Sequence, residues 1–223
     1  MNLFLTSVSD TVRDIDYLKN SINNETKLVI LPLAHDFNYI SCKEDLYIHY
    51  DRDPFNKDSI FWRTVRPFID IGIHSENIVV INVYTDPYKL IELKLLDKNT
   101  IVFIPGGFPE NIVKTLKRFK LCEIIKQCNT VIGESAGSMF WSRTYFVYPD
   151  NDYKKYQCFK GIKLIKDFVV IPHYNPDNEK ISKALKRFRK FHNKVVYLVP
   201  DGGWVWYDTN SKRIIEQHGC TLY

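Results

Sequence analysis

The stretch VIGESAGSMFW (131–141) decides the fold. An apolar run reaches Gly133, and Ser135 then stands between small residues before apolar residues resume. A short apolar run that ends in small residues predicts a buried strand, a tight turn and the start of a helix. Residues 133–137 also fit G-x-S-x-G, in which a serine on such a turn holds its hydroxyl clear of the sheet. The stretch therefore predicts a strand–turn–helix unit and makes Ser135 a candidate nucleophile, although a plain turn has the same pattern.

Short apolar runs alternate with helical patterns along the rest of the chain. Several runs are continuous and β-branched, which is typical of strands buried on both faces of a parallel sheet. Predicted strands cover residues 3–7, 27–34, 77–84, 100–107, 130–135, 168–173 and 194–200. Predicted helices cover residues 10–22, 59–72, 109–128, 136–144 and 177–191, and a terminal hairpin turns near Asn210 and Ser211. This alternation predicts one α/β domain over residues 1–223, a three-layer sandwich around a mostly parallel sheet.

Composition excludes several classes of protein. With 45% hydrophobic and 26% charged residues, the chain of 223 residues is expected to fold around a sizeable core. The net charge of +5 is mild, and the basic run KALKRFRK (183–190) is better explained as a solvated helix face than as a nucleic-acid site. No apolar run is long enough to span a membrane, and the N-terminus lacks the features of a signal peptide.

The five cysteines form no metal-binding pattern, so no metal or other cofactor is expected. Their odd, unpatterned number indicates reduced thiols and a cytoplasmic protein. They are Cys42, Cys122, Cys128, Cys158 and Cys220.

A serine nucleophile needs a base and an acid that orients the base. His173 ends the apolar run FVVIP and is the first candidate for the base, while His35, after another predicted strand, is the competitor. Asp201 follows the next predicted strand after His173, and Asp150 is the alternative acid. Since parallel strands end at one edge of a sheet, Asp201 has the stronger placement, although an aspartate before two glycines is also a common turn residue.

The predicted strand that ends in PGG could supply part of an oxyanion hole. Gly107 could present its N–H to a ligand because glycine has no Cβ in the way. The N–H of Ala136, at the start of the predicted helix, is the second candidate donor.

Together these motifs resemble the serine peptidases of the dipeptidase E (α-aspartyl dipeptidase) and cyanophycinase family. The resemblance runs from the strand at 3–7 to the PDGG segment, and it is sharpest in GESAGS and in PHYNP, where Ser135 and His173 lie 38 residues apart. It implies a class I glutamine amidotransferase-like, flavodoxin-like α/β fold. It also implies Ser135 as nucleophile, His173 as base, Asp201 or Asp150 as the acid, and Gly107 and Ala136 as oxyanion donors.

The segment after the paired glycines departs from the family. The dipeptidases carry a polar Asn–Thr type segment there, whereas this chain has Phe-Pro-Glu-Asn at 108–111. A preference for N-terminal aspartate would also need a cation near the site, for which Lys183, Lys186 and Arg187 are candidates. Residues close to the motifs that could bind the amino terminus of a substrate are Glu110, Asn111 and Glu134.

The predicted function is therefore hydrolysis of short peptides, with a possible preference for N-terminal aspartate, through an acyl-enzyme. Alternatives are an esterase or amidase on the same site, and a non-catalytic amidotransferase-like binding protein. The expected partner is a small peptide, with no nucleic acid or membrane, and the protein is expected to be a monomer or a homodimer.

Overall fold

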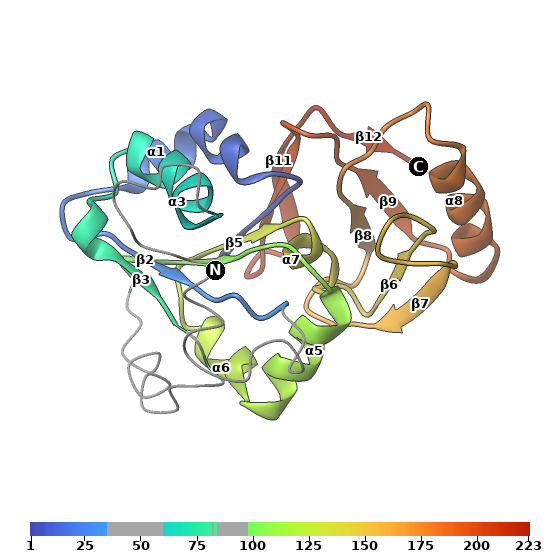
Figure 1. Ribbon diagram of the computed structural model, residues 1–223, viewed down its shortest axis with the longest axis horizontal. Coiled ribbons are helices and arrows are strands. Elements are labelled where there is room, and N and C mark those ends of the chain that lie inside the picture. Colours follow the sequence, from blue (N-terminus) through green and yellow to red (C-terminus); the bar gives the residue numbers. More distant parts are fainter. Residues whose placement is uncertain (35–59, 82, 84–97) are drawn as a thin grey trace.

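A seven-stranded sheet forms the centre of the computed structural model, which describes residues 1–34, 60–81, 83 and 98–223 (Figure 1). The strand order is β11-β10-β1-β5-β4-β2-β3. Five neighbouring strands, from β1 to β3 in that order, are parallel, while β10 and β11 add an antiparallel hairpin. These strands are β1 (Asn2–Thr6), β2 (Lys27–Ile30), β3 (Ile78–Val80), β4 (Thr100–Ile104), β5 (Thr130–Glu134), β10 (Trp204–Asp208) and β11 (Arg213–His218).

Helices cover both faces of this sheet, so the predicted three-layer α/β fold is confirmed. The helices α1 (Asp16–Ser21) and α3 (Ile60–Asp70) lie on one face, and α5 (Pro109–Arg118) and α6 (Leu121–Ile125) lie on the other (Figure 1). Two short 3₁₀ helices, η1 (Ser9–Asp14) and η2 (Ser75–Asn77), complete the first layer.

Successive side chains of the central strands point to opposite layers, as the pleat requires. In β4, Phe103 packs with the α1–α3 layer, whereas Val102 and Ile104 pack with the α5–α6 layer. In β5, Val131 packs with the α5–α6 layer and Ile132 with the α1–α3 layer. All of these side chains are buried. The continuous apolar runs of the sequence are thus explained by strands that are covered on both sides.

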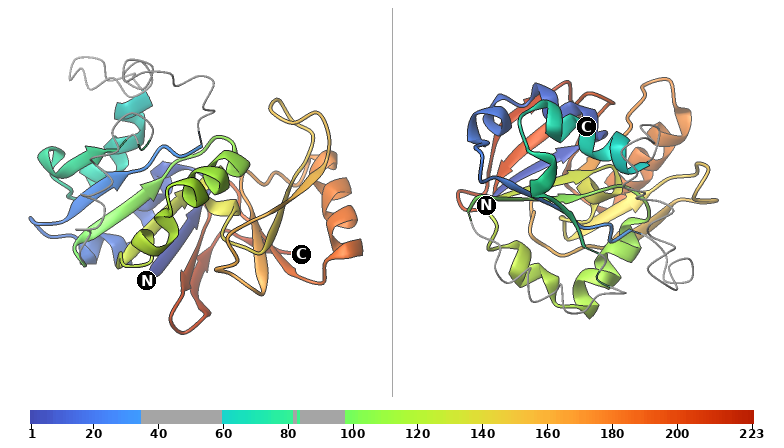
Figure 2. Two further views of the ribbon diagram at one scale, coloured as in Figure 1. Left: turned by 90° about the horizontal axis from the view of Figure 1, so that it is seen from below. Right: turned by 60° about the vertical axis from the view of Figure 1, so that its left-hand side comes forward.

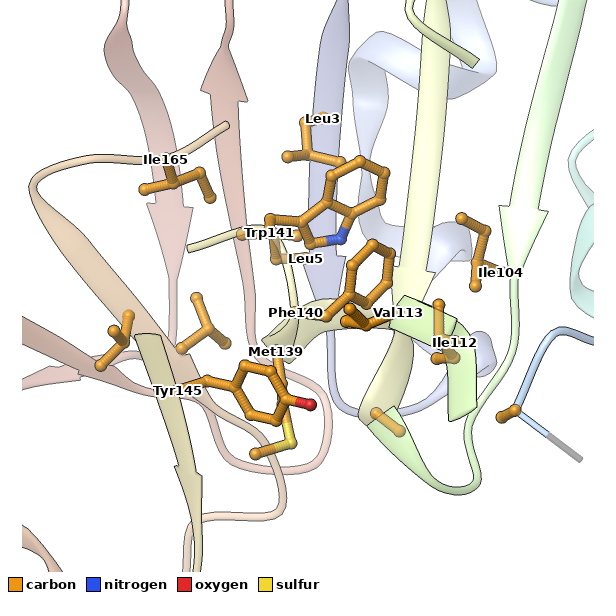
Figure 3. Packing of buried hydrophobic residues seen from close by; sticks show 14 of the residues in the cluster. Leu3, Leu5, Ile104, Ile112, Val113, Met139, Phe140, Trp141, Tyr145 and Ile165 are labelled. Carbon is orange, nitrogen blue, oxygen red and sulfur yellow. The ribbon is translucent and has the colours of Figure 1, made fainter. Parts of the chain in front are cut away.

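A second, smaller sheet holds the strands β8 (Phe168–Ile171), β9 (Val195–Leu198) and β12 (Thr221–Leu222). Helix α8 (Glu179–Phe191) lies on its outer side (Figures 1 and 2). The side facing the main sheet packs against α7 (Ala136–Met139), and Met139, Phe140 and Trp141 are buried in the shared core (Figure 3).

Several predicted boundaries are wrong. The helix predicted at 136–144 ends at Met139, because residues 144–147 form β6, which pairs with the unpredicted β7 (Gln157–Lys160). The helices predicted at 10–22 and 109–128 are each divided in two, the latter at Lys120, whose φ is 53°. The strand predicted at 27–34 ends at Ile30, and the one at 77–84 covers 78–80, with 82 and 84 outside the described residues. The hairpin near Asn210 is confirmed.

Candidate active site

The sequence around Ser135 packs so tightly that two glycines are required. A Cβ at Gly133 would lie 2.1 Å from the carbonyl oxygen of Gly137, and a Cβ at Gly137 would lie 2.1 Å from that of Ile104. The start of α7 is thereby pressed against the ends of β4 and β5. Ser135 itself has φ 51° and ψ −117°, a conformation that non-glycine residues rarely adopt. Backbone strain of this kind at a strand-to-helix turn is what the G-x-S-x-G pattern predicts.

Replacing Gly137 with alanine should therefore destabilise the protein by about 3 kcal/mol, since the new methyl group meets backbone rather than a movable side chain. Denaturant unfolding of the wild type and the variant would measure this loss. The matched control is Gly202→Ala, where no atom lies within 4 Å of the new Cβ and only the positive φ of 86° opposes alanine. A cost of about 1 kcal/mol is expected there, and equal costs at the two positions would contradict the packing argument.

Ser135, His173 and Asp201 are joined by hydrogen bonds. Ser135 Oγ lies 2.8 Å from His173 Nε2, and His173 Nδ1 lies 2.7 Å from Asp201 Oδ1. The parallel pairing of β8 with β9 sets Ile171 beside Leu198, so both strands end at the same edge. His173 and Asp201 follow these two ends within a few residues, which explains why they meet.

Ser7 connects these strand ends to the main sheet. Its buried hydroxyl accepts a hydrogen bond from His173 N at 2.9 Å and donates one to Val199 O at 2.6 Å. His173 has a φ of 54°, so this contact holds it in a strained conformation. Ser7 was not among the predicted residues, although its place directly after β1 could have indicated it.

A cavity of about 190 Å³ opens beside Ser135. The two candidate oxyanion donors, Gly107 and Ala136, both line it together with Ser135 and His173. Ala136 is the first residue of α7, where a helix leaves its N–H without an intrahelical acceptor. The Ser135 hydroxyl and the two residues predicted as oxyanion donors therefore border one cavity.

The structure separates the two candidate acids. Asp201 contacts His173, whereas Asp150 lines the cavity and accepts hydrogen bonds from the N–H groups of Asp152 and Tyr153, both at 2.8 Å. His35, the alternative base, lies outside the described residues.

None of the three predicted substrate-binding residues lines this cavity. Glu110 accepts a 2.7 Å hydrogen bond from the hydroxyl of Tyr153, and the buried Asn111 donates to Ala34 O at 3.4 Å. Glu134 accepts hydrogen bonds from Ser9 N at 2.8 Å and Gly106 N at 3.3 Å. Glu134 thus holds the end of β4, next to Gly107.

Burial raises the pKa of Glu134 above its ordinary value of 4.5, against the opposing effect of the N–H groups of Gly106 and Ser9. The folded protein consequently holds this proton more tightly than the unfolded chain. The stability that protonation contributes is complete below the ordinary pKa and is lost as the pH rises through the raised pKa. Glu134→Gln cannot titrate, so the unfolding free energy of the wild type minus that of the variant should fall across this window. Urea unfolding of both proteins from pH 4 to 8 would measure it; a difference that rises with pH would contradict the assignment.

The candidate cations lie elsewhere. Lys183 pairs with Glu179 at 3.2 Å on the exposed side of α8, Lys186 is exposed, and Arg187 lies over the ring of Tyr156. None of the three lines the cavity beside Ser135.

The model of peptidase family S51 matches residues 55–215. The chain belongs to peptidase family S51. This confirms the resemblance inferred from the motifs around Ser135 and His173, and it places the S51 chain among the peptide hydrolases.

A solved structure described as a peptidase E protein from Listeria monocytogenes EGD-e is similar over 97% of each chain, with a TM-score of 0.62 and 19% identity. At this identity the likeness shows that the S51 chain shares the fold. No curated protein sequence matches the chain significantly. Among the described residues, no helix has both the length and the apolar character needed to cross a membrane, and no group of three or more acidic, histidine or cysteine side chains is arranged to hold a metal ion.

Proposed function

We propose that the chain is a serine peptidase that cleaves short peptides through an acyl-enzyme. The observation that carries this proposal is the unbroken hydrogen-bonded series from Ser135 through His173 to Asp201, beside a cavity lined by two backbone donors. Membership of a peptidase family supports peptides as the substrate class.

In the proposed mechanism, Asp201 accepts a hydrogen bond from His173 Nδ1–H and so keeps Nε2 available as the base. His173 Nε2 takes the proton of Ser135 Oγ as this oxygen attacks the peptide carbonyl. The N–H groups of Gly107 and Ala136 stabilise the oxyanion that forms. His173 then donates the proton to the leaving amine, and a water molecule hydrolyses the ester by the same route in reverse.

Covalent labelling tests the nature of the nucleophile without any choice of peptide. Diisopropyl fluorophosphate should attach to Ser135, as located by mass spectrometry, and hydrolysis of a dipeptide panel should stop in proportion to labelling. Ser138 is a useful internal control, because its buried hydroxyl hydrogen-bonds with Thr6 O and Gly133 O and should not react. Unlabelled Ser135 in a folded protein would favour the alternative of a non-catalytic binding protein.

A further inference from the structure

Two carboxylates line the same cavity as the reacting groups. Its lining includes the apolar residues Met139, Val147 and Ile171, and also Asp150 and Asp152 with Tyr148 and Tyr153. Among the described residues that line it there is no lysine and no arginine.

The loop that bears the two carboxylates is ordered by its own hydrogen bonds. Asp150 Oδ1 accepts from the N–H groups of Asp152 and Tyr153, and Asp150 N donates to Tyr153 O at 2.9 Å. Tyr153 is in turn fixed by its hydroxyl, which donates to Glu110. These bonds order the backbone of the loop, and the bond from Tyr153 to Glu110 ties the loop to α5.

Carboxylates also raise the pKa of tyrosines near the cavity. Burial raises the pKa of Tyr148, and the Asp150 carboxylate raises it further. Burial likewise raises the pKa of Tyr145, with a further contribution from Glu110. The Tyr145 hydroxyl is buried, has no hydrogen-bond partner among the described residues, and points toward Met139, which lines the cavity (Figure 3). A positive group in the cavity would be favoured by this field, and a carboxylate would be repelled.

We propose that this cavity selects substrates that present a cationic group, an ammonium or a guanidinium, to Asp150 and Asp152 while the scissile carbonyl lies at Ser135. The inference rests on the proposed function and departs from a preference for N-terminal aspartate. The cation can come from a basic side chain or from the free amino terminus, and both would meet the same two carboxylates. The cavity's volume of about 190 Å³ suits one residue of a short peptide.

Paired peptides that differ in charge but little in shape test the inference. We expect kcat/KM to be about tenfold higher for Arg-Ala than for citrulline-Ala, and lower for Asp-Ala than for Asn-Ala, since each exposed carboxylate contributes a modest interaction. Both differences should shrink as the salt concentration rises. N-acetyl-Arg-Ala separates the two sources of charge: loss of cleavage on acetylation assigns the carboxylates to the amino terminus, and retained cleavage with an Arg preference assigns them to the side chain.

The Asp150→Asn/Asp152→Asn variant should reduce the charge preference to about threefold or less. Asparagine keeps the side-chain oxygen that accepts at position 150, so the loop is expected to persist. Asp14→Asn/Asp16→Asn is the matched control, because it removes the same charge from exposed residues outside the cavity and should leave the preference intact. An unchanged preference in the cavity variant would overturn the inference.

Binding to Ser135→Ala keeps the inference separate from the proposed function. Calorimetry measures the affinities of the variant for arginine amide and citrulline amide, and so gives the charge preference without turnover. Fluorophosphate labelling of the wild type measures the reactivity of Ser135. Labelled Ser135 with equal binding of the two amides, equal cleavage of the paired peptides and retained cleavage of N-acetyl-Arg-Ala would overturn the inference alone, because neither source of positive charge would then matter. Unlabelled Ser135 with no cleavage would overturn the proposed function, and the binding preference would still decide the inference. A preference for Asp-Ala over Asn-Ala would also overturn it.

Discussion

Replacing Ser135 with alanine is expected to lower the hydrolysis of a cleaved dipeptide by about 10⁴- to 10⁶-fold. The variant has no oxygen to form the acyl-enzyme, so the covalent route is lost while the cavity and both backbone donors remain. The measurement is kcat/KM for wild type and variant prepared side by side. The substrate is the dipeptide of the panel that the wild type cleaves most efficiently.

The fold of this variant should be retained. Ser135 Oγ has His173 Nε2 as its hydrogen-bond partner, and the backbone bond from Ser135 N to Thr6 O is kept in alanine. Ser138→Ala is a matched control that removes a buried structural hydroxyl near the same turn. It should lower stability more than Ser135→Ala and hydrolysis far less. Hydrolysis within tenfold of the wild type in Ser135→Ala would exclude the nucleophile assignment.

Asp201→Asn should slow both hydrolysis and fluorophosphate labelling by about 10²- to 10⁴-fold. The asparagine amide can donate to His173 Nδ1, which would favour the tautomer that carries its proton on Nε2 and cannot accept one from Ser135. Because the Asp201 side chain is 66% exposed, water can replace part of its role, so an effect toward the lower end of this range is expected.

Asp150→Asn is the comparison that separates the two acids. Asp150 lines the cavity, but the hydrogen bond to His173 is made by Asp201. The effect of Asp150→Asn on the labelling rate should therefore be at least tenfold smaller than that of Asp201→Asn. The labelling rate separates orientation of His173 from binding of a cationic substrate group, because the reagent carries no cation that the cavity could bind. The reverse order of effects would move the orienting role to Asp150.

Local sequence was sufficient where a residue's role depends on its immediate neighbours. Gly133 and Gly137 mark the tight turn because a Cβ at either would meet backbone atoms, and the turn forces Ser135 into its strained conformation. The helix predicted from residue 136 could not be delimited in this way. Its end at Met139 depends on pairing of residues 144–147 with residues 157–160, which local periodicity does not reveal.

The sequence by itself determined the α/β class, the strand–turn–helix unit at Ser135 and the short set of candidate partners, because these follow from burial patterns and turn chemistry within a few residues. Only the tertiary structure shows that Asp201 rather than Asp150 contacts His173, since that contact depends on which strand lies beside β8. The tertiary structure also shows that Asp150 and Asp152 line the cavity. The predicted substrate-binding residues, Glu110, Asn111 and Glu134, do not line it. The sign of charge facing a substrate is a property of side chains from separate loops, and their distances are set by packing of the whole fold.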